Sequence, residues 1–201
     1  MKRRFNVLIL SLVPLMYLGA TDPHHKGAIA MNTAAAAKPA DQAKAQDHAR
    51  DFDFLMGKWK IHNKRLKDRL KGSSEWIEFE ATCAARSILA GTGNEDEYRT
   101  EFWPGFVGMS FRFYNPTTKL WSIYWADSRR GLGVLEPPVM GHFVAGRGVF
   151  EGQDTFEGRP IVVRYIWSRA DTPSPRWEQA FSEDGGKTWE TNWIMDFTRV
   201  E

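Results

Sequence analysis

Cysteine and histidine are scarce in this 201-residue sequence, which limits the chemistry that it can carry. The single cysteine, Cys83, excludes any disulfide within the chain. It lies in an alternating apolar run, where a buried structural thiol is expected rather than a nucleophile. Only His62 and His142 lie beyond residue 50, and there is no H-E-x-x-H pair or Cys/His cluster. We therefore predict neither a metal site nor a cofactor, and interpret both histidines as structural or exposed rather than as haem ligands.

Motifs that bind nucleotides or build hydrolase sites are absent from the sequence. There is no P-loop, no dinucleotide fingerprint and no G-x-S-x-G nucleophile elbow. The net charge is only +2, and without Lys2, Arg3 and Arg4 the 27 basic residues become 24, against 25 acidic residues. The basic balance thus belongs to the N-terminus, and binding of nucleic acid is not expected.

The first fifty residues resemble a targeting segment followed by a linker. Three basic residues precede an apolar run over 5–20, which ends in Gly19 and Ala20, as a secretory signal does. Pro14 interrupts this run, which is short for a membrane span. Residues 21–50 are rich in alanine and predict a disordered linker. The protein is thus expected in the periplasm or outside the cell, without a stable membrane span after cleavage. If translation starts at Met31, it is cytoplasmic.

From residue 51 onward the apolar pattern changes to a period of two, which indicates strands. Strands are predicted over 58–66, 75–88, 95–103, 107–114, 121–126, 140–144, 148–156, 161–167, 177–181 and 189–197. Turn residues separate them, such as Asn115-Pro116 and Asp184-Gly185-Gly186. Many short antiparallel strands predict an all-β sandwich or barrel.

Residues at the two ends of this domain favour the barrel. Gly57 and Trp59 form a G-x-W pattern at the start of the first strand, and Arg199 stands near the end of the last. This combination resembles the lipocalin and calycin hallmark, in which the arginine lies across the tryptophan ring. We therefore expect residues 51–201 to form a single antiparallel, calycin-like barrel of about 8–10 strands.

Several longer strings extend the resemblance. FDFLMGKWKIHNKRLKDRL, LWSIYWADSRRG, LEPPVMGHF and RWEQAFSEDGGKTWETNW look like the bacterial family called domain of unknown function 1579. The resemblance covers almost all of residues 52–199. It implies a calycin-like barrel and brings no established activity, substrate or catalytic residue.

Tryptophan and phenylalanine are abundant, with nine and thirteen copies, and they gather on one face of the predicted strands. If this face points into the barrel, it fills the interior or lines a cavity for a flat apolar ligand. The residues predicted to bind such a ligand are Trp121, Trp125, Trp167, Trp177, Trp193 and Phe111, with Tyr165 and Gln179 as polar anchors.

The opposite face gives a second hypothesis. Arg112, Tyr124, Arg164, Glu178 and Asn192 would make a polar cavity suited to acid–base chemistry, with Glu178 opposite Asn192 across the last hairpin. The protein would then be an enzyme acting on a small molecule.

Two further patterns are interpreted as structural. Residues 182–189 match the Asp box of propeller proteins once, which indicates a folding turn rather than a sialidase. The basic residues Arg65, Lys67, Arg69 and Lys71 predict a solvated hairpin tip, with contact to an anionic lipid or polar ligand as the alternative. The leading hypothesis is a protein that binds a small apolar or aromatic molecule. The alternatives are the enzyme above and a structural or partner-binding barrel with a filled core, and no pattern indicates an oligomeric state.

Overall fold

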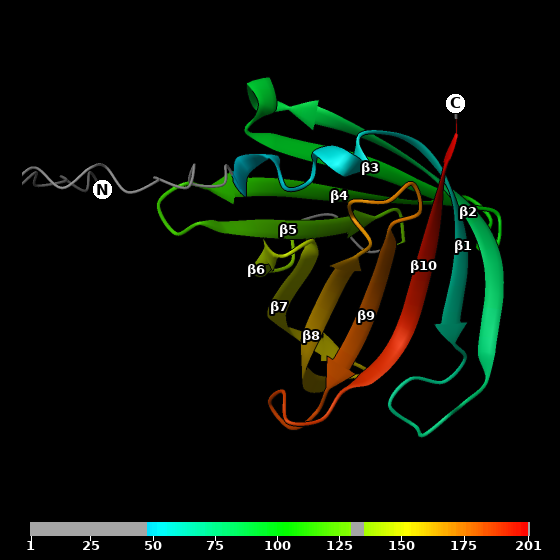
Figure 1. Ribbon diagram of the computed structural model, residues 1–201. Coiled ribbons are helices and arrows are strands. Elements are labelled where there is room, and N and C mark those ends of the chain that lie inside the picture. Colours follow the sequence, from blue (N-terminus) through cyan, green and yellow to red (C-terminus); the bar gives the residue numbers. More distant parts are fainter. Residues whose placement is uncertain (1–47, 130–134, 201) are drawn as a thin grey trace, which may run out of the picture. The chain divides into compact units, whose positions relative to one another are not determined.

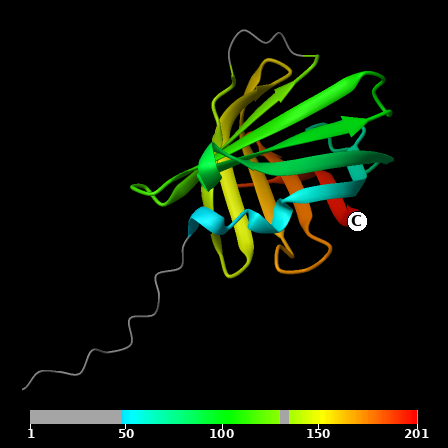
Figure 2. The same cartoon turned by 90° about the horizontal axis from the view of Figure 1, so that it is seen from above.

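Ten antiparallel strands close into one barrel in the computed structural model, which describes residues 48–129 and 135–200. Each strand pairs with its neighbours in sequence, and β1 closes the ring on β10 (Figures 1 and 2). In Figure 1, β4 and β5 run across the view while β8, β9 and β10 run down it. The expected all-β, calycin-like barrel is confirmed. The signal peptide predicted over 1–20 and the linker up to residue 47 lie outside the described residues.

The strands are β1 (Gly57–Leu66), β2 (Trp76–Ile88), β3 (Gly93–Thr100), β4 (Phe106–Asn115), β5 (Leu120–Asp127), β6 (Val139–Val144), β7 (Arg147–Phe156), β8 (Arg159–Ser168), β9 (Arg176–Ser182) and β10 (Glu190–Val200). Three short 3-10 turns accompany them, η1 (His48–Arg50), η2 (Asp53–Leu55) and η3 (Leu89–Gly91). All ten predicted strand ranges are strands, with ends shifted by a few residues. Over residues 48–129 and 135–200 no helix has the length and apolarity to cross a bilayer.

Local turn chemistry explains why neighbouring strands form hairpins. The side chain of Asn115 accepts hydrogen bonds from the backbone N–H groups of Thr117 and Thr118, at 2.9 and 3.2 Å, and so turns β4 into β5. In the predicted Asp box, Asp184 Oδ1 accepts from the backbone of Lys187 and Thr188, at 3.0 and 2.9 Å. Hydrogen bonding, above all from Thr188, holds the pKa of Asp184 well below its ordinary value. The box therefore serves as the turn between β9 and β10.

One end of the barrel is closed by the chain that enters it. Residues 48–56, which we call the N-terminal plug, lie across the end where β1 begins and β10 finishes. Phe52 and Leu55 are fully buried, and Phe52 contacts the rings of Trp121 and Phe143 edge-on, both at 5.0 Å between centroids. Trp121 also donates from Nε1 to the carbonyl of His48 at 2.9 Å. Residues 48–50, assigned to the linker by composition, thus belong to this closure.

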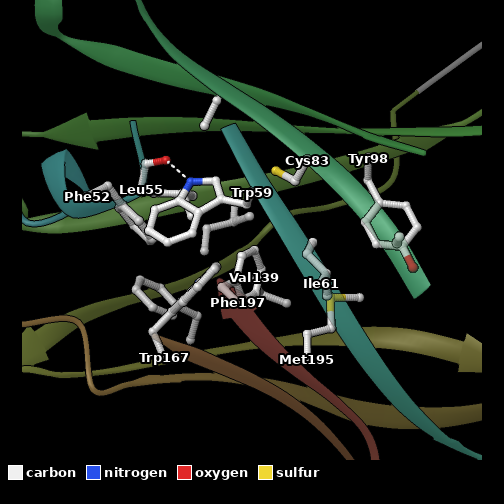
Figure 3. Packing of buried hydrophobic residues seen from close by; sticks show 14 of the residues in the cluster. Phe52, Leu55, Trp59, Ile61, Cys83, Tyr98, Val139, Trp167, Met195 and Phe197 are labelled. Atoms are coloured by element: carbon white, nitrogen blue, oxygen red, sulfur yellow. Dashed lines mark hydrogen bonds between the residues drawn. The ribbon is translucent and has the colours of Figure 1, made fainter. Parts of the chain in front are cut away.

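The G-x-W signature has the geometry expected of it. Trp59 is 1% exposed, and its Nε1 donates to the carbonyl of Leu55 at 2.7 Å (Figure 3). The guanidinium carbon of Arg199 stands 4.1 Å from the centre of the Trp59 ring, and its nitrogens donate to the carbonyls of Met56 and Phe54. Gly57 has φ +117°, and a Cβ there would lie 2.7 Å from Arg199 Nη1. The three residues therefore join the plug to both terminal strands.

Two details of the strands differ from the sequence interpretation. In β4 the buried positions are Phe106, Gly108, Ser110 and Arg112, so that Phe111 and its alternating apolar partners face outward. In the last hairpin, Glu178 pairs with Ile194 and not with Asn192. A β-bulge between Thr191 and Trp193 shifts the register, because it places an extra residue in β10.

Candidate functional site

The half of the barrel away from the plug holds a cavity of about 250 Å³. Its mouth lies where β1 ends and β10 begins, since exposed lining residues such as Glu136, Gln153 and Thr155 stand there. Its floor lies among Asp96, Arg112 and Trp167 in the middle of the barrel. The interior is therefore neither solid nor hollow throughout. Aromatic packing fills the plug half, and the other half is open, with a volume just below the roughly 300–1,000 Å³ usual for ligand pockets.

Aromatic rings form much of the cavity wall. Trp177 on β9 lies edge-on to Trp193 on β10, with 6.0 Å between centroids, and 4.9 Å from Tyr165 on β8. Trp103, from the loop between β3 and β4, meets Trp193 at 5.9 Å. On the other wall Trp125 covers Gly108 of β4, where any Cβ would run into the indole. Flat, partly exposed indoles facing a common space favour contact with a flat apolar molecule.

Six of the eight residues predicted to bind a ligand line this cavity: Trp125, Tyr165, Trp167, Trp177, Gln179 and Trp193. The structure does not bring the other two to it. Trp121 faces inward on β5, but it is only 1% exposed and packs against Phe52 of the plug. Phe111 lies on the outward face of β4, opposite Tyr124 of β5. The two-residue alternation of the sequence separates the two faces of β4. It does not indicate which face points into the barrel, because both faces carry large side chains.

A buried ion pair forms part of the floor. Arg112 Nη2 and Asp96 Oδ2 are 2.5 Å apart, with side chains only 4% and 7% exposed. Arg112 Nη1 donates to Asn94 Oδ1 at 3.2 Å, and the guanidinium stands 5.1 Å from the ring of Phe52. Burial, followed by the charge of Asp96, raises the pKa of the neighbouring Cys83 thiol well above its ordinary value. Cys83 is therefore an unreactive thiol in the cavity wall.

Hydrogen-bonded amides hold the aromatic wall in place. Asn63 Oδ1 accepts from the Tyr98 hydroxyl and from Trp193 Nε1, each at 3.0 Å, and Asn63 itself is fully buried. Burial raises the pKa of the Tyr98 phenol, so it stays a neutral donor. Gln179 Nε2 donates to Asn192 Oδ1 at 2.8 Å. The bulge in β10 makes this second pair possible, because it turns Asn192 inward.

Two arginines of the predicted basic tip stand at the mouth of the cavity instead of in solvent. Arg65 is the last inward residue of β1, and Arg69 lies in the loop after it. The guanidinium of Arg69 stacks over Phe156 at 4.4 Å and that of Arg65 over Trp103 at 5.4 Å. Burial lowers the pKa of Arg65 below its ordinary value. Arg65 and Arg69 are thus half-buried, whereas Lys67 of the same predicted tip is exposed and pairs with Glu75.

The polar face proposed for acid–base chemistry does not converge. Arg112 and Asn192 point inward, but Arg164 lies outside, where it pairs with Glu151 and stacks over Trp189 at 3.5 Å. Tyr124 and Glu178 also lie on outward positions. The enzyme hypothesis based on this cluster therefore loses its geometric basis. In residues 48–129 and 135–200, no group of three or more His, Cys, Asp and Glu side chains is arranged so that it could hold a metal ion.

Sequence reasoning missed Arg65, Trp103 and Asp96 as members of the site. Arg65 continues the inward alternation of Trp59, Ile61 and Asn63, which was a usable signal. Trp103 comes from a loop and Asp96 from an acidic run, and neither has a periodic pattern that would place it. Comparison with known proteins adds no assignment: neither a protein-family model nor a curated protein matches the chain.

Proposed function

We propose that the barrel binds a small apolar or aromatic molecule in the cavity opposite the plug. The observation that carries this proposal is a space of about 250 Å³ walled by Trp103, Trp125, Trp177 and Trp193. Indoles expose large apolar area that a flat ligand can cover, and the amides and arginines among them can orient its polar groups. A barrel filled throughout would leave no such space between these indoles.

We also propose a family and a cellular location for the protein. The strings over residues 52–199 support membership of the family called domain of unknown function 1579. The basic, apolar and small-residue segments of the first twenty residues support export to the periplasm or beyond. A binding protein outside the cytoplasm would bind a compound that reaches the cell from its surroundings or leaves it.

The test is native mass spectrometry of the protein purified from its own host, followed by tryptophan fluorescence. We expect a retained small molecule, and a fluorescence change when naphthalene or 2-naphthol is added. The Trp193→Phe variant should respond more weakly than Trp76→Phe, because Trp76 is an exposed residue of β2 away from the cavity. Absence of any retained molecule, together with unchanged fluorescence across a panel of apolar compounds, would contradict the proposal.

A further inference from the structure

The guanidinium of Arg65 is held at the cavity mouth without a hydrogen-bond acceptor in the part of the chain that the structure describes. Its Nε is fully buried and has no partner. The rings of Trp103 and Trp193 lie 5.4 and 5.5 Å from its central carbon. The two indoles hold the guanidinium in position by cation–π contact, but they accept no N–H in its plane.

In the described part of the chain, the buried side-chain nitrogen and oxygen atoms without partners share one chemical type. Over residues 48–129 and 135–200 they are Nε of Arg65, Nε of Arg112 and Nδ2 of Asn192, all of them N–H donors. Two of these three residues line the cavity. A buried donor without an acceptor costs on the order of 1–3 kcal/mol, and more when it is charged. Among the described residues, Arg65 therefore lacks an acceptor at its place in the wall, and a ligand that supplies one to its guanidinium would be favoured.

The carboxylates that line the cavity do not compensate Arg65. Asp96 forms its ion pair with Arg112 on the floor. The other three come from β5, from the segment before β6 and from β7, which stand across the barrel from β1 in the ring of strands. Asp127 accepts from Trp125 Nε1, and Asp154 from the backbone of Thr155. In the described chain none of them lies within ion-pair distance of Arg65. The positive charge of Arg65 therefore stands on the β1 side of the mouth, across the barrel from these carboxylates.

We propose that the ligand carries a carboxylate, or a planar anion of similar shape, which Arg65 binds while the apolar body lies against Trp177 and Trp193. This inference rests on the proposed function and specifies its ligand class. A guanidinium offers two parallel N–H groups to a carboxylate, and such charge-assisted pairs are among the stronger hydrogen bonds in proteins. The acidic groups of the facing wall would disfavour the reverse orientation, with the anion at β5–β7.

Isothermal titration calorimetry of the full-length protein with 2-naphthoate and 2-naphthamide tests the proposal. The two probes share the ring system and differ in charge. We expect 2-naphthoate to bind on the order of 10-fold to 100-fold more tightly, as a charged hydrogen bond predicts. Arg65→Gln should remove this preference and Arg65→Lys should keep part of it. The control is Arg164→Gln, since Arg164 also stacks over an indole, that of Trp189, but lies on the outer wall and pairs with Glu151.

Each other outcome has a distinct meaning. If both probes bind with equal affinity to the wild-type protein, the anionic ligand is excluded while the proposed function stands. If Arg65→Gln weakens both probes equally, Arg65 only supports the wall, and the inference is overturned. Failure of both probes to bind contradicts the proposed function itself. Thermal unfolding shows whether each variant folds. If Arg65→Gln does not fold, the comparison of 2-naphthoate with 2-naphthamide on the wild-type protein still tests whether the ligand is an anion.

Discussion

Single polar residues decide how the aromatic side chains stand inside the barrel. Trp193 is fixed by its hydrogen bond to Asn63, and Asn63 in turn holds the hydroxyl of Tyr98. The buried amide oxygen of Asn63 accepts two hydrogen bonds, which leaves the indole little freedom to rotate. Breaking either hydrogen bond would leave a buried polar group without a partner. Such residues make the cavity wall rigid before any ligand arrives. Rigid walls reduce the ordering cost of binding.

A histidine on the outer wall gives a prediction about pH. His62 Nδ1 lies 2.7 Å from Glu80 Oε1, and its Nε2 lies 2.9 Å from Glu78 Oε2. The bond to Glu80, which outweighs the opposing effect of burial, raises the pKa of His62 above 6.5. On the neighbouring strand β10, Asp196 stands opposite His62 in the backbone register. Its carboxylate accepts a hydrogen bond from Arg176 instead.

We expect the NMR titration of His62 to give a pKa above 6.5, and Glu80→Gln to lower it. Because the pKa is raised in the folded state, the stability that this contact adds is fully present below about pH 6.5. It is lost as the pH rises through the folded pKa. Glu151→Gln, which changes a carboxylate paired elsewhere on the outer wall, serves as the control. A His62 pKa at or below 6.5 would contradict the assignment.

At the scale of elements, closure of the barrel depends on a segment that is hardly regular at all. The plug contains only two 3-10 turns of three residues each, too short to be stable alone. It is held by burial of Phe52 and Leu55 and by the bonds that Arg199 makes to its carbonyls. Among the described residues, the β5–β6 seam has the fewest paired positions, three, and Phe52 packs between Trp121 of β5 and Phe143 of β6. The plug therefore supports the weakest junction between strands.

Phe52→Ala should lower the free energy of unfolding by about 3–5 kcal/mol, the usual cost of removing a fully buried phenylalanine. Urea unfolding followed by circular dichroism measures it. Val144→Ala is the control, because Val144 is 64% exposed and should change stability little. A loss in Phe52→Ala as small as that of the control would show that the plug is not part of the cooperative core.

For the whole molecule, one barrel contains two interiors of different character. The plug half is packed with apolar side chains such as Phe52, Trp59 and Phe150. The other half keeps a space bordered by an ion pair, amides and arginines. Cys83 lies between them, 5% exposed and next to Asp96. Its reactivity therefore reports whether the closed barrel opens.

Iodoacetamide should label Cys83 in the folded protein at least about 100-fold more slowly than in urea, because the thiolate is the reactive form and burial suppresses it. Labelling is followed by mass spectrometry over time. Phe52→Ala should speed the reaction by favouring opening, whereas Val144→Ala should not. Labelling of the folded protein as fast as in urea would mean that the interior is freely accessible.

The sequence by itself determined the order of strands and turns and the way the barrel closes. Two-residue alternation and turns such as the one at Asn115 depend on residues close in sequence. Gly57 and Trp59 mark the start of the first strand, and Arg199 marks the end of the last. For the site, alternation also placed Trp177 and Trp193 on a common face, and both line the cavity.

Where both faces of a strand carry large side chains, only the tertiary structure decided which residues face the cavity. Closure of the ring turned Ser110 and Arg112 of β4 inward and Phe111 outward. A bulge that no local pattern predicts moved Asn192 inside and separated it from Glu178. The charge environment of Arg65 arises from strands more than sixty residues away, because the carboxylates that could have paired with it lie across the barrel. Pairing between distant strands sets these positions, and one-dimensional periodicity carries no information about it.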